Sequence, residues 1–174
     1  RLVEYPDKDT GEASTSSSDD VATTYDEQGE ALTTTDQNGS THTYSYDSLG
    51  RMILDAVTTL ASGVDDSILA IGTTYNTQGL IDTITSYSDD TATTVANQIK
   101  RTYNGLGQMI TEYQEHNGAV DTGSSYYVAY GYDTLAHGAR AISMRYPNGT
   151  ELDYNYGTAD GLNDVISRLD NISE

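Results

Sequence analysis

The residues of this chain that could perform chemistry are histidines, carboxylates, hydroxyl groups and tyrosine rings. Histidine occurs at His42, His116 and His137, without the His-Glu-x-x-His spacing of zinc sites. Cysteine is absent from the sequence, which excludes disulfides, thiolate zinc ligands and cysteine nucleophiles. We therefore expect the histidines to be surface residues, and we assign no zinc site.

Acidic residues are the other candidates for metal binding. The segment Asp7-Lys8-Asp9-Thr10-Gly11-Glu12 alternates oxygen ligands around a glycine, but it lacks the later acidic positions of a calcium loop. We expect a solvated turn there. Weak calcium binding stays open as an alternative at three aspartate pairs in expected loops, Asp19-Asp20, Asp65-Asp66 and Asp89-Asp90. We expect no other cofactor.

The motifs of the common enzyme classes are missing from the sequence. No serine lies in a Gly-x-Ser-x-Gly elbow, and no glycine-rich phosphate loop opens a helix. A glycosidase needs two carboxylates at a set separation in a cleft, and no pair in the sequence is marked in this way. We therefore expect a protein that is not an enzyme.

Tyrosine supplies every aromatic ring, with fifteen tyrosines and no Phe or Trp. Alternation places Tyr44 with Tyr46, Tyr130 with Tyr132, and Tyr154 with Tyr156 on one strand face. Such rings can pair across strands, each pair contributing about 0.2 to 1 kcal/mol, and they can also stack on sugars. The recurrence of the pattern favours the scaffold interpretation, with carbohydrate binding as the alternative.

A repeated element positions these tyrosines. Six times a tyrosine opens a short turn that contains or resembles an acid-x-x-glycine sequence, at intervals of 21 to 29 residues. This periodicity is typical of repeat proteins. The regular copies are Tyr25-Asp26 to Gly29, Tyr46-Asp47 to Gly50, Tyr75-Asn76 to Gly79, and Tyr103-Asn104 to Gly107. The degraded copies are Tyr132-Asp133-Thr134-Leu135-Ala136 and Tyr156 to Gly161.

Each copy predicts a hairpin. The acid at the first turn position can accept hydrogen bonds from backbone amides, and a glycine such as Gly50 or Gly107 can adopt a positive φ at the fourth. Further hairpin signatures lie between the copies, at 36–39, 115–118 and 146–149. We predict an all-β fold of antiparallel hairpins with about a dozen strands. The polar segments 13–22 and 85–97 are expected to form long loops.

Composition limits the classes of partner. The net charge of -19 repels nucleic acid, and the 36% hydrophobic content predicts a thin core. The longest apolar stretch, Ile68-Leu69-Ala70-Ile71, is far below the roughly 18 residues of a membrane span. Because the chain begins at Arg1, we expect it to be an internal piece of a longer protein.

The residues Tyr46-Asp47-Ser48-Leu49-Gly50-Arg51, Tyr103 to Gln108 and Tyr146 to Thr150 resemble the tyrosine-aspartate repeats of RHS-repeat proteins. This family includes bacterial polymorphic toxins, the cocoon-forming subunits of insecticidal toxin complexes, and the animal teneurins. The resemblance covers about Ala22 to Ser173, and it implies a β-hairpin ribbon that winds in a spiral, like a β-solenoid. In long members the ribbon closes into a hollow shell around a C-terminal toxin. The family's self-cleaving core motif has no match here, so self-cleavage is not expected.

From these observations we predict that residues 1–21 form a partial repeat and a loop, and residues 22–174 one continuous array of about six repeats. We expect a structural segment of a secreted or cell-surface bacterial protein that builds a sheet wall, shell or filament. Its expected partners are adjacent repeats or copies of itself. A carbohydrate-binding adhesion module and a fragment of a toxin-encapsulating cocoon are the alternatives.

Overall fold

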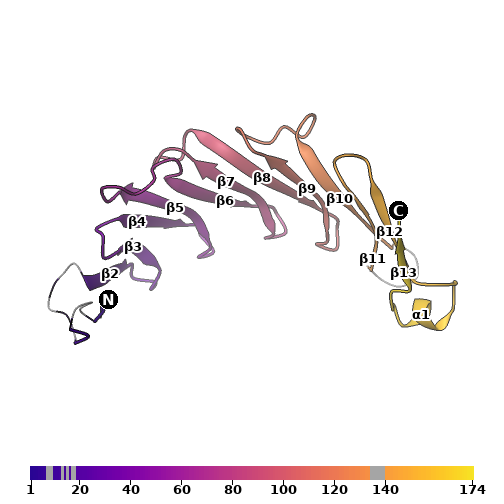
Figure 1. Ribbon diagram of the computed structural model, residues 1–174, viewed down its shortest axis with the longest axis horizontal. Coiled ribbons are helices and arrows are strands. Elements are labelled where there is room, and N and C mark those ends of the chain that lie inside the picture. Colours follow the sequence, from indigo (N-terminus) through magenta and orange to yellow (C-terminus); the bar gives the residue numbers. More distant parts are fainter. Residues whose placement is uncertain (7–9, 13, 15, 17–18, 134–139) are drawn as a thin grey trace. The chain divides into compact units, whose positions relative to one another are not determined.

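The computed structural model describes residues 1–6, 10–12, 14, 16, 19–133 and 140–174. Across these residues thirteen strands form one sheet, in which the strands follow one another in chain order (Figure 1). The strands are β1 (Leu2–Glu4), β2 (Asp20–Tyr25), β3 (Ala31–Thr35), β4 (Thr41–Tyr46), β5 (Met52–Thr59), β6 (Ala70–Tyr75), β7 (Ile81–Tyr87), β8 (Val95–Tyr103), β9 (Met109–Glu115), β10 (Tyr126–Tyr132), β11 (Ala141–Arg145), β12 (Glu151–Asn155) and β13 (Asn171–Ser173). The predicted all-β, antiparallel hairpin architecture is confirmed.

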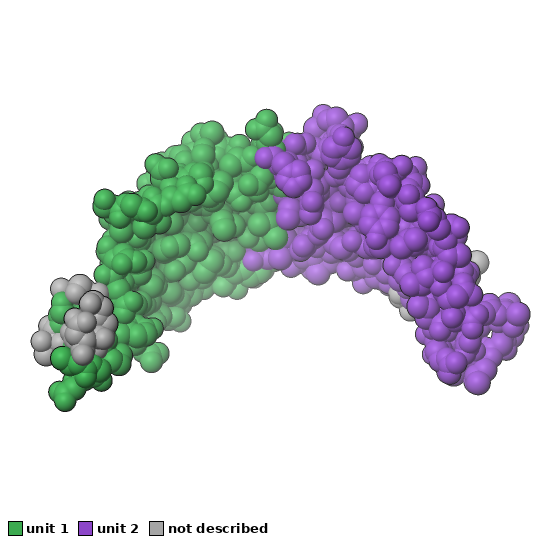
Figure 2. All heavy atoms as spheres, in the orientation of Figure 1, with its two compact units in different colours: residues 1–74, 83–98, 117–119 green, residues 75–82, 99–116, 120–174 purple. Residues whose placement is uncertain are grey.

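The chain divides into two compact units, which Figure 2 distinguishes by colour. The first unit comprises residues 1–74, 83–98 and 117–119, and the second comprises residues 75–82, 99–116 and 120–174. Each unit is built from hairpins of the predicted kind. No helix in the described part of the chain has the length and apolar character that crossing a membrane requires.

Threonine pairs join neighbouring strands across the sheet. In the first unit the hydroxyl of Thr24 lies 2.7 Å from that of Thr33, and Thr74 lies 2.7 Å from Thr83. Successive side chains of a strand point to opposite faces, so the face that carries Thr24 is opposite the face that carries Tyr25. The strands therefore owe their cohesion to backbone ladders and polar cross-strand pairs as much as to apolar burial.

The core is as thin as the composition predicts. Ala56 and Ala70 are the buried hydrophobic side chains among the described residues. The buried polar residues include Ser40 and Thr85, which lie within or beside strands. Most strand residues are half-buried, as expected for a single layer of sheet.

A β-bulge follows the turn in the first unit's motif hairpins. In β2 and β3, Tyr25 pairs with Ala31 while Thr24 pairs with Thr33, so Leu32 is an extra residue. The hairpin of β4 and β5 shows the same shift, because Tyr46 pairs with Met52 and Ser45 with Leu54. Bulges of this kind increase local twist and re-aim the side chains beside them.

Two predicted loop boundaries are wrong. The segment 85–97 was expected to be a long loop, but β7 continues to Tyr87 and β8 begins at Val95. The connection is limited to residues 88–94, because Thr85 is buried and accepts a hydrogen bond of 2.8 Å from Gln98 Nε2. In the segment 13–22, Asp20 to Ala22 belong to β2, and residues 13, 15, 17 and 18 lie outside the described residues.

The hairpin signature at 115–118 is also wrong as a site of strand reversal. Gly118 has a φ of 109°, but its N–H donates to the Ala96 carbonyl (3.0 Å) instead of closing a turn on residue 115. The chain reverses later, where Ser124 and Ser125 both donate backbone bonds to the Asp121 carbonyl. A glycine after asparagine signals a positive φ, but it does not determine which carbonyl accepts the bond.

A short helix, α1 (Leu162–Val165), lies between β12 and β13, where the sequence predicted only a degraded turn. The turn from Tyr156 to Gly161 does not reverse the chain as the regular copies do. Instead Gly161 begins the helix with an extended backbone, at φ -70° and ψ 165°. This is a correction to the predicted sixth copy.

Candidate functional site: the tyrosine-acid hairpin turn

The regular turns share one hydrogen-bond pattern, which Asp47 illustrates. Its carbonyl accepts from the Gly50 N–H (3.0 Å), and its own N–H donates to the Arg51 carbonyl (2.9 Å). The carboxylate atom Oδ1 accepts two more backbone N–H groups, from Leu49 at 2.9 Å and from Arg51 at 3.0 Å. One short side chain therefore satisfies the amides that the reversal leaves without strand partners.

The same pattern recurs at the other predicted turns. Asp26 Oδ1 accepts from the backbone of Gln28 (2.9 Å) and Glu30 (2.8 Å). The amide oxygens of Asn76 and Asn104 accept two backbone N–H groups each, at distances of 2.9 to 3.0 Å. Asp36 Oδ1 likewise accepts from the backbone N–H groups of Asn38 and Ser40, both at 2.9 Å, although no tyrosine precedes this turn.

The fourth position of each turn requires the left-handed backbone region. The glycines there have φ values of 90° at Gly29, 75° at Gly50, 80° at Gly79 and 78° at Gly107. Glycine adopts this region without a Cβ clash, whereas other residues are strained in it. The positive φ predicted for Gly50 and Gly107 is present.

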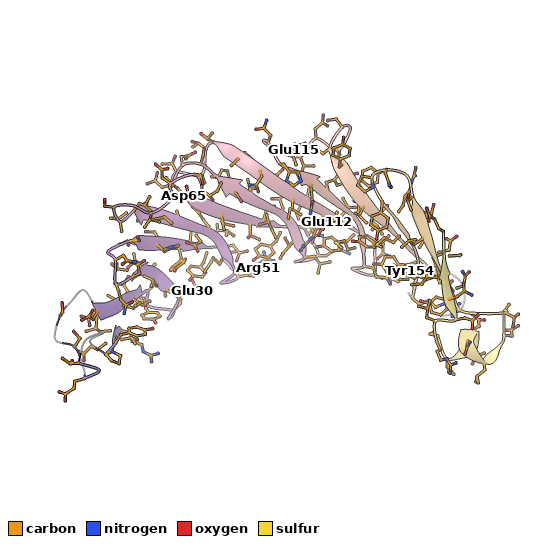
Figure 3. All side chains as sticks on the ribbon, in the orientation of Figure 1. Glu30, Arg51, Asp65, Glu112, Glu115 and Tyr154 are labelled. Carbon is orange, nitrogen blue, oxygen red and sulfur yellow. The ribbon has the colours of Figure 1, made fainter. Side chains whose placement is uncertain are left out.

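At Asp47 and Asn104, the side chain of the residue after the glycine forms hydrogen bonds with the acid or amide at the first turn position. Arg51 donates from Nε (2.8 Å) and Nη2 (2.6 Å) to Asp47 Oδ2, a bidentate ion pair. In the amide version, Asn104 Nδ2 donates to Gln108 Oε1 at 2.7 Å. The hydrogen bonds from Arg51 hold the pKa of Asp47 below its usual range, so its carboxylate stays ionised. Figure 3 shows Arg51 and Glu30 at neighbouring hairpin turns.

The motif tyrosines bind the preceding hairpin. Tyr46 donates its hydroxyl proton to the Ala31 carbonyl (3.0 Å), and Tyr103 donates to the Ile81 carbonyl (2.8 Å). Tyr132 donates to Met109 (3.0 Å), and Tyr156 donates to Ala141 (2.7 Å). Each acceptor is the first residue of the returning strand in the hairpin before, so the tyrosines connect repeats as well as strands.

Tyr25 and Tyr75 occupy the same motif position at the ends of β2 and β6. Tyr25 is 47% exposed, whereas Tyr75 is half-buried.

Burial raises the pKa of the Tyr46 hydroxyl, and the charge of Glu30 raises it further. The hydroxyl therefore remains protonated and can donate at every physiological pH.

The degraded copy at Tyr132 keeps the motif in a longer form. Asp133 donates its N–H to the Arg140 carbonyl (3.0 Å), as Asp47 does to Arg51, and Thr134, Leu135 and Ala136 lie outside the described residues. Arg140 donates from Nη2 to Asp164 Oδ1 (2.6 Å), lies 3.5 Å from Asp133 Oδ2, and covers the Tyr156 ring at 4.1 Å from its centroid. This arginine joins both degraded copies to α1.

The tyrosine rows lie where alternation places them. The pKa of Tyr130 is raised, first by burial and then by the charges of Glu112 and of the neighbouring Tyr132 and Tyr154. Tyr130 therefore lies near Tyr132 of its own strand and near Tyr154 of β12, the other predicted tyrosine strand of the second unit. A further pair, Tyr113 and Tyr127, has ring centroids 5.0 Å apart across β9 and β10.

Among the candidate metal ligands, His42 contacts other side chains of the fold. His42 Nδ1 lies 2.6 Å from Asp55 Oδ1 on the adjacent strand, and its ring stacks on Tyr44 with centroids 6.2 Å apart. His116 is exposed, and His137 lies outside the described residues, as do Asp7, Lys8 and Asp9. In the described part of the chain, no group of three or more His, Asp or Glu side chains is arranged to hold a metal ion.

Asp89 organises the connection between β7 and β8, a role that sequence reasoning missed. Its Oδ1 accepts from the Thr91 hydroxyl (2.6 Å) and from the Thr93 N–H (3.0 Å), and its Oδ2 accepts from the Thr94 N–H (2.6 Å). These bonds, led by the Thr91 hydroxyl, hold the pKa of Asp89 well below its usual range. The threonines at alternate positions after the aspartate were the available signal.

Replacing Asp89 with Asn should make the protein's stability less sensitive to acid. The folded-state pKa lies below the unfolded value of about 3.9, so the carboxylate stabilises the fold fully above about pH 4. That contribution is lost as the pH falls through the folded-state pKa. Urea midpoints measured between pH 7 and pH 2 should show a smaller decline for Asp89→Asn than for Asp90→Asn. Equal declines would contradict the role of Asp89.

The fold and the tyrosine bonds together define a single-layer β-repeat protein. Residues 25–64 match the family model of the RHS repeat, which confirms the resemblance drawn from the tyrosine-aspartate motifs. The RHS repeat is therefore present at residues 25–64. No curated protein matches the sequence significantly.

A solved structure has a similar fold. The crystal structure of TcdB2-TccC3-TEV aligns with a TM-score of 0.56 and 20% identity, over 79% of this chain and 6% of that one. The crystal structure of TcdB2-TccC3 without its hypervariable C-terminal region aligns with a TM-score of 0.37 and 14% identity, over 90% of this chain and 10% of that chain. A Photorhabdus luminescens Tc holotoxin pore aligns with a TM-score of 0.35 and 20% identity, over 79% of this chain and 8% of that chain. This chain therefore spans a small part of the proteins it resembles.

Proposed function

We propose that this chain is a wall segment of an RHS-repeat protein, with a structural and not an enzymatic role. The observation that supports the proposal is the repeated bond from a motif tyrosine hydroxyl to a carbonyl of the preceding hairpin. At these four tyrosines the bond links a hairpin to its neighbour without a second layer of structure. A sheet built in this way can extend by adding repeats and needs no core beneath it.

The surroundings of such a wall follow from the family resemblance. We propose that the parent protein is secreted or displayed at the cell surface, and that the segment forms part of a hollow cocoon. The match of residues 25–64 to the RHS repeat and the fold shared with TcdB2-TccC3-TEV support this assignment. Its partners would be the adjacent repeats.

Electron microscopy of the purified full-length protein tests the proposal. We expect thin-walled particles with an interior space, in which this segment lies within the wall. A solid globular particle, or a flexible chain of separate domains, would contradict it. A closed hollow particle would favour the cocoon, whereas an open ribbon would favour a filament or surface layer.

Removing one tyrosine hydroxyl should measurably weaken the joint between hairpins. Tyr103→Phe keeps the ring but leaves the Ile81 carbonyl without the donor at 2.8 Å, so the free energy of unfolding should fall by about 1 kcal/mol. Tyr126→Phe is the matched control, because Tyr126 is 72% exposed. Urea unfolding followed by circular dichroism measures both. Equal stability of the two variants would mean that the bond contributes nothing.

The terminal strands of the segment should mediate self-association when the charge is screened. In the described strand order β1 pairs with β2 and β13 pairs with β12, which leaves one outer edge on each. Outer edges carry backbone groups that can pair with another chain, but the net charge of -19 opposes contact. Light scattering of the segment should therefore rise between about 10 mM and 1 M salt, where the screening length falls from about 30 to 3 Å. A constant monomer would show that the edges are protected.

A further inference from the structure

The second unit contains a notch beside the first residues of β10. The pairing of β10 with β9 begins at Tyr126, whereas its pairing with β11 begins at Ala129, which lies opposite Arg145. Residues 126–128 therefore extend past the end of β11. The chain then turns away at Tyr146, whose carbonyl accepts from the Gly149 N–H at 2.9 Å.

Tyrosine rings and hydroxyl groups line this notch. A pocket of about 230 Å³ is bounded by residues 122–127 on one side and by residues 145–147 on the other. A smaller pocket of about 90 Å³ shares Tyr126, Tyr127 and Pro147 with it and continues along β10 to Glu112, which Figure 3 labels on the neighbouring strand. Tyr126 is 72% exposed and Tyr146 is 39% exposed, so their rings are accessible.

Arg145 gives the notch a positive charge that the fold does not use. Arg51, Lys100, Arg101 and Arg140 each form an ion pair with an aspartate or glutamate. Within the described residues, no acidic side chain forms an ion pair with Arg145, although Glu151 lies opposite it in the register of β12. The Arg145 side chain is exposed, so its guanidinium is open to a ligand.

We propose that this notch binds an acidic sugar, a single uronic-acid ring held by its carboxylate. Arg145 would bind the carboxylate through the two parallel hydrogen bonds that guanidinium groups favour. The tyrosine rings offer apolar faces to the sugar, and Thr122 offers a hydroxyl group to its own hydroxyls. Ser124 Oγ donates to Asp121 Oδ2 (3.0 Å) and can accept a hydrogen bond from the sugar.

The size of the notch decides between a sugar and a peptide strand. Its volume of about 230 Å³ is below the roughly 300 Å³ at which pockets for drug-sized ligands begin, so one ring fits better than a chain. An added peptide strand needs an edge of about five residues, whereas the overhang of β10 has the length of residues 126–128. Pro147 also lacks the N–H that a peptide partner would need.

Amide chemical-shift mapping by NMR with galacturonate tests the proposal. We expect shifts at residues 122–127 and 145–147, with a Kd of about 1 mM, as is typical of a ligand of this size. Galactose has the same ring without the carboxylate, and it should bind at least about tenfold more weakly. The Arg145→Gln variant should bind galacturonate as weakly as the wild type binds galactose.

Matched variants distinguish the site from general charge effects. Arg168→Gln removes the same charge from an exposed position outside the notch and should leave galacturonate binding unchanged. Tyr126→Ala should weaken galactose and galacturonate alike, whereas Tyr5→Ala, at another exposed tyrosine, should weaken neither. Shifts spread over the surface, equal losses in Arg145→Gln and Arg168→Gln, or no shifts at 10 mM galacturonate would each overturn the proposal.

Discussion

Replacing Arg140 with Met should lower the free energy of unfolding by about 3 kcal/mol, the largest effect that we expect from a single substitution. The Arg140 side chain is 14% exposed and the Asp164 side chain 9%, so their pair at 2.6 Å is largely removed from water. Breaking a buried pair by removing one partner costs about 3 to 5 kcal/mol, because the remaining charge has no compensation. The backbone carbonyl of Asp164 also loses its bond to Nη1 (2.9 Å).

Hydrogen exchange should locate this loss at the C-terminal end. Amides of α1 and of residues 160–170 should lose protection in Arg140→Met, while those of β2 to β5 keep theirs. Adding Asp164→Asn should restore part of the stability, because the uncompensated charge is removed while Asp160 keeps an acceptor for its N–H. The same loss in Arg145→Met, at an exposed arginine, would show that the effect does not come from the Arg140–Asp164 pair.

Replacing Gly50 with Val should cost about 2 kcal/mol. Gly50 has a φ of 75°, a region in which a β-branched side chain is strained by about 1 to 3 kcal/mol. A Cβ at this position would also lie 2.6 Å from Glu30 Oε1, so the end of the Glu30 side chain must move. Thermal and urea unfolding measure the total cost.

Two further glycines separate these contributions. Gly29 has a φ of 90° and open space around it, so Gly29→Val should show the backbone strain alone. Gly105 has open space and no positive φ, so Gly105→Val should change stability little. We expect losses in the order Gly50, Gly29, Gly105. If Gly105→Val were as destabilising as Gly50→Val, the turn assignment would have to be abandoned.

The hairpins could be predicted from the sequence because their determinants are local. An acid or amide at the first turn position and a glycine at the fourth specify the hydrogen bonds of Asp47 and Asn104 within five residues. The alternation of Tyr44 and Tyr46 likewise places both rings on one face. These features depend on the chain's own neighbours and on no distant contact.

The errors arose where distant contacts decide the structure. The N–H of Gly118 bonds to Ala96 in β8, which precedes it by 22 residues, and no local pattern indicates that partner. Thr85 lies in a polar run that reads as a loop, but Gln98 satisfies its hydroxyl and allows it to be buried. Arg140 and Asp164 are 24 residues apart, so their pair is invisible to turn rules.

The candidate site was predicted in part. The tyrosines were expected to pair across strands, but their hydroxyl bonds to the preceding hairpin were not foreseen. A signal existed in the position of these tyrosines, since each lies at the end of a strand or directly after it, where a side chain can reach the neighbouring hairpin. The notch at Tyr126 depends on the unequal ends of β10 and β11, which the sequence does not reveal.

The tyrosine bonds have a direction along the chain. Every acceptor carbonyl precedes its tyrosine, by 15 residues for Tyr46 and Tyr156, 22 for Tyr103 and 23 for Tyr132. A ribosome that adds about 5 to 20 residues per second therefore delivers each donor within a few seconds of its acceptor. The nascent protein can build its sheet vectorially, one hairpin at a time, and no segment has to wait for the C-terminus to be synthesised.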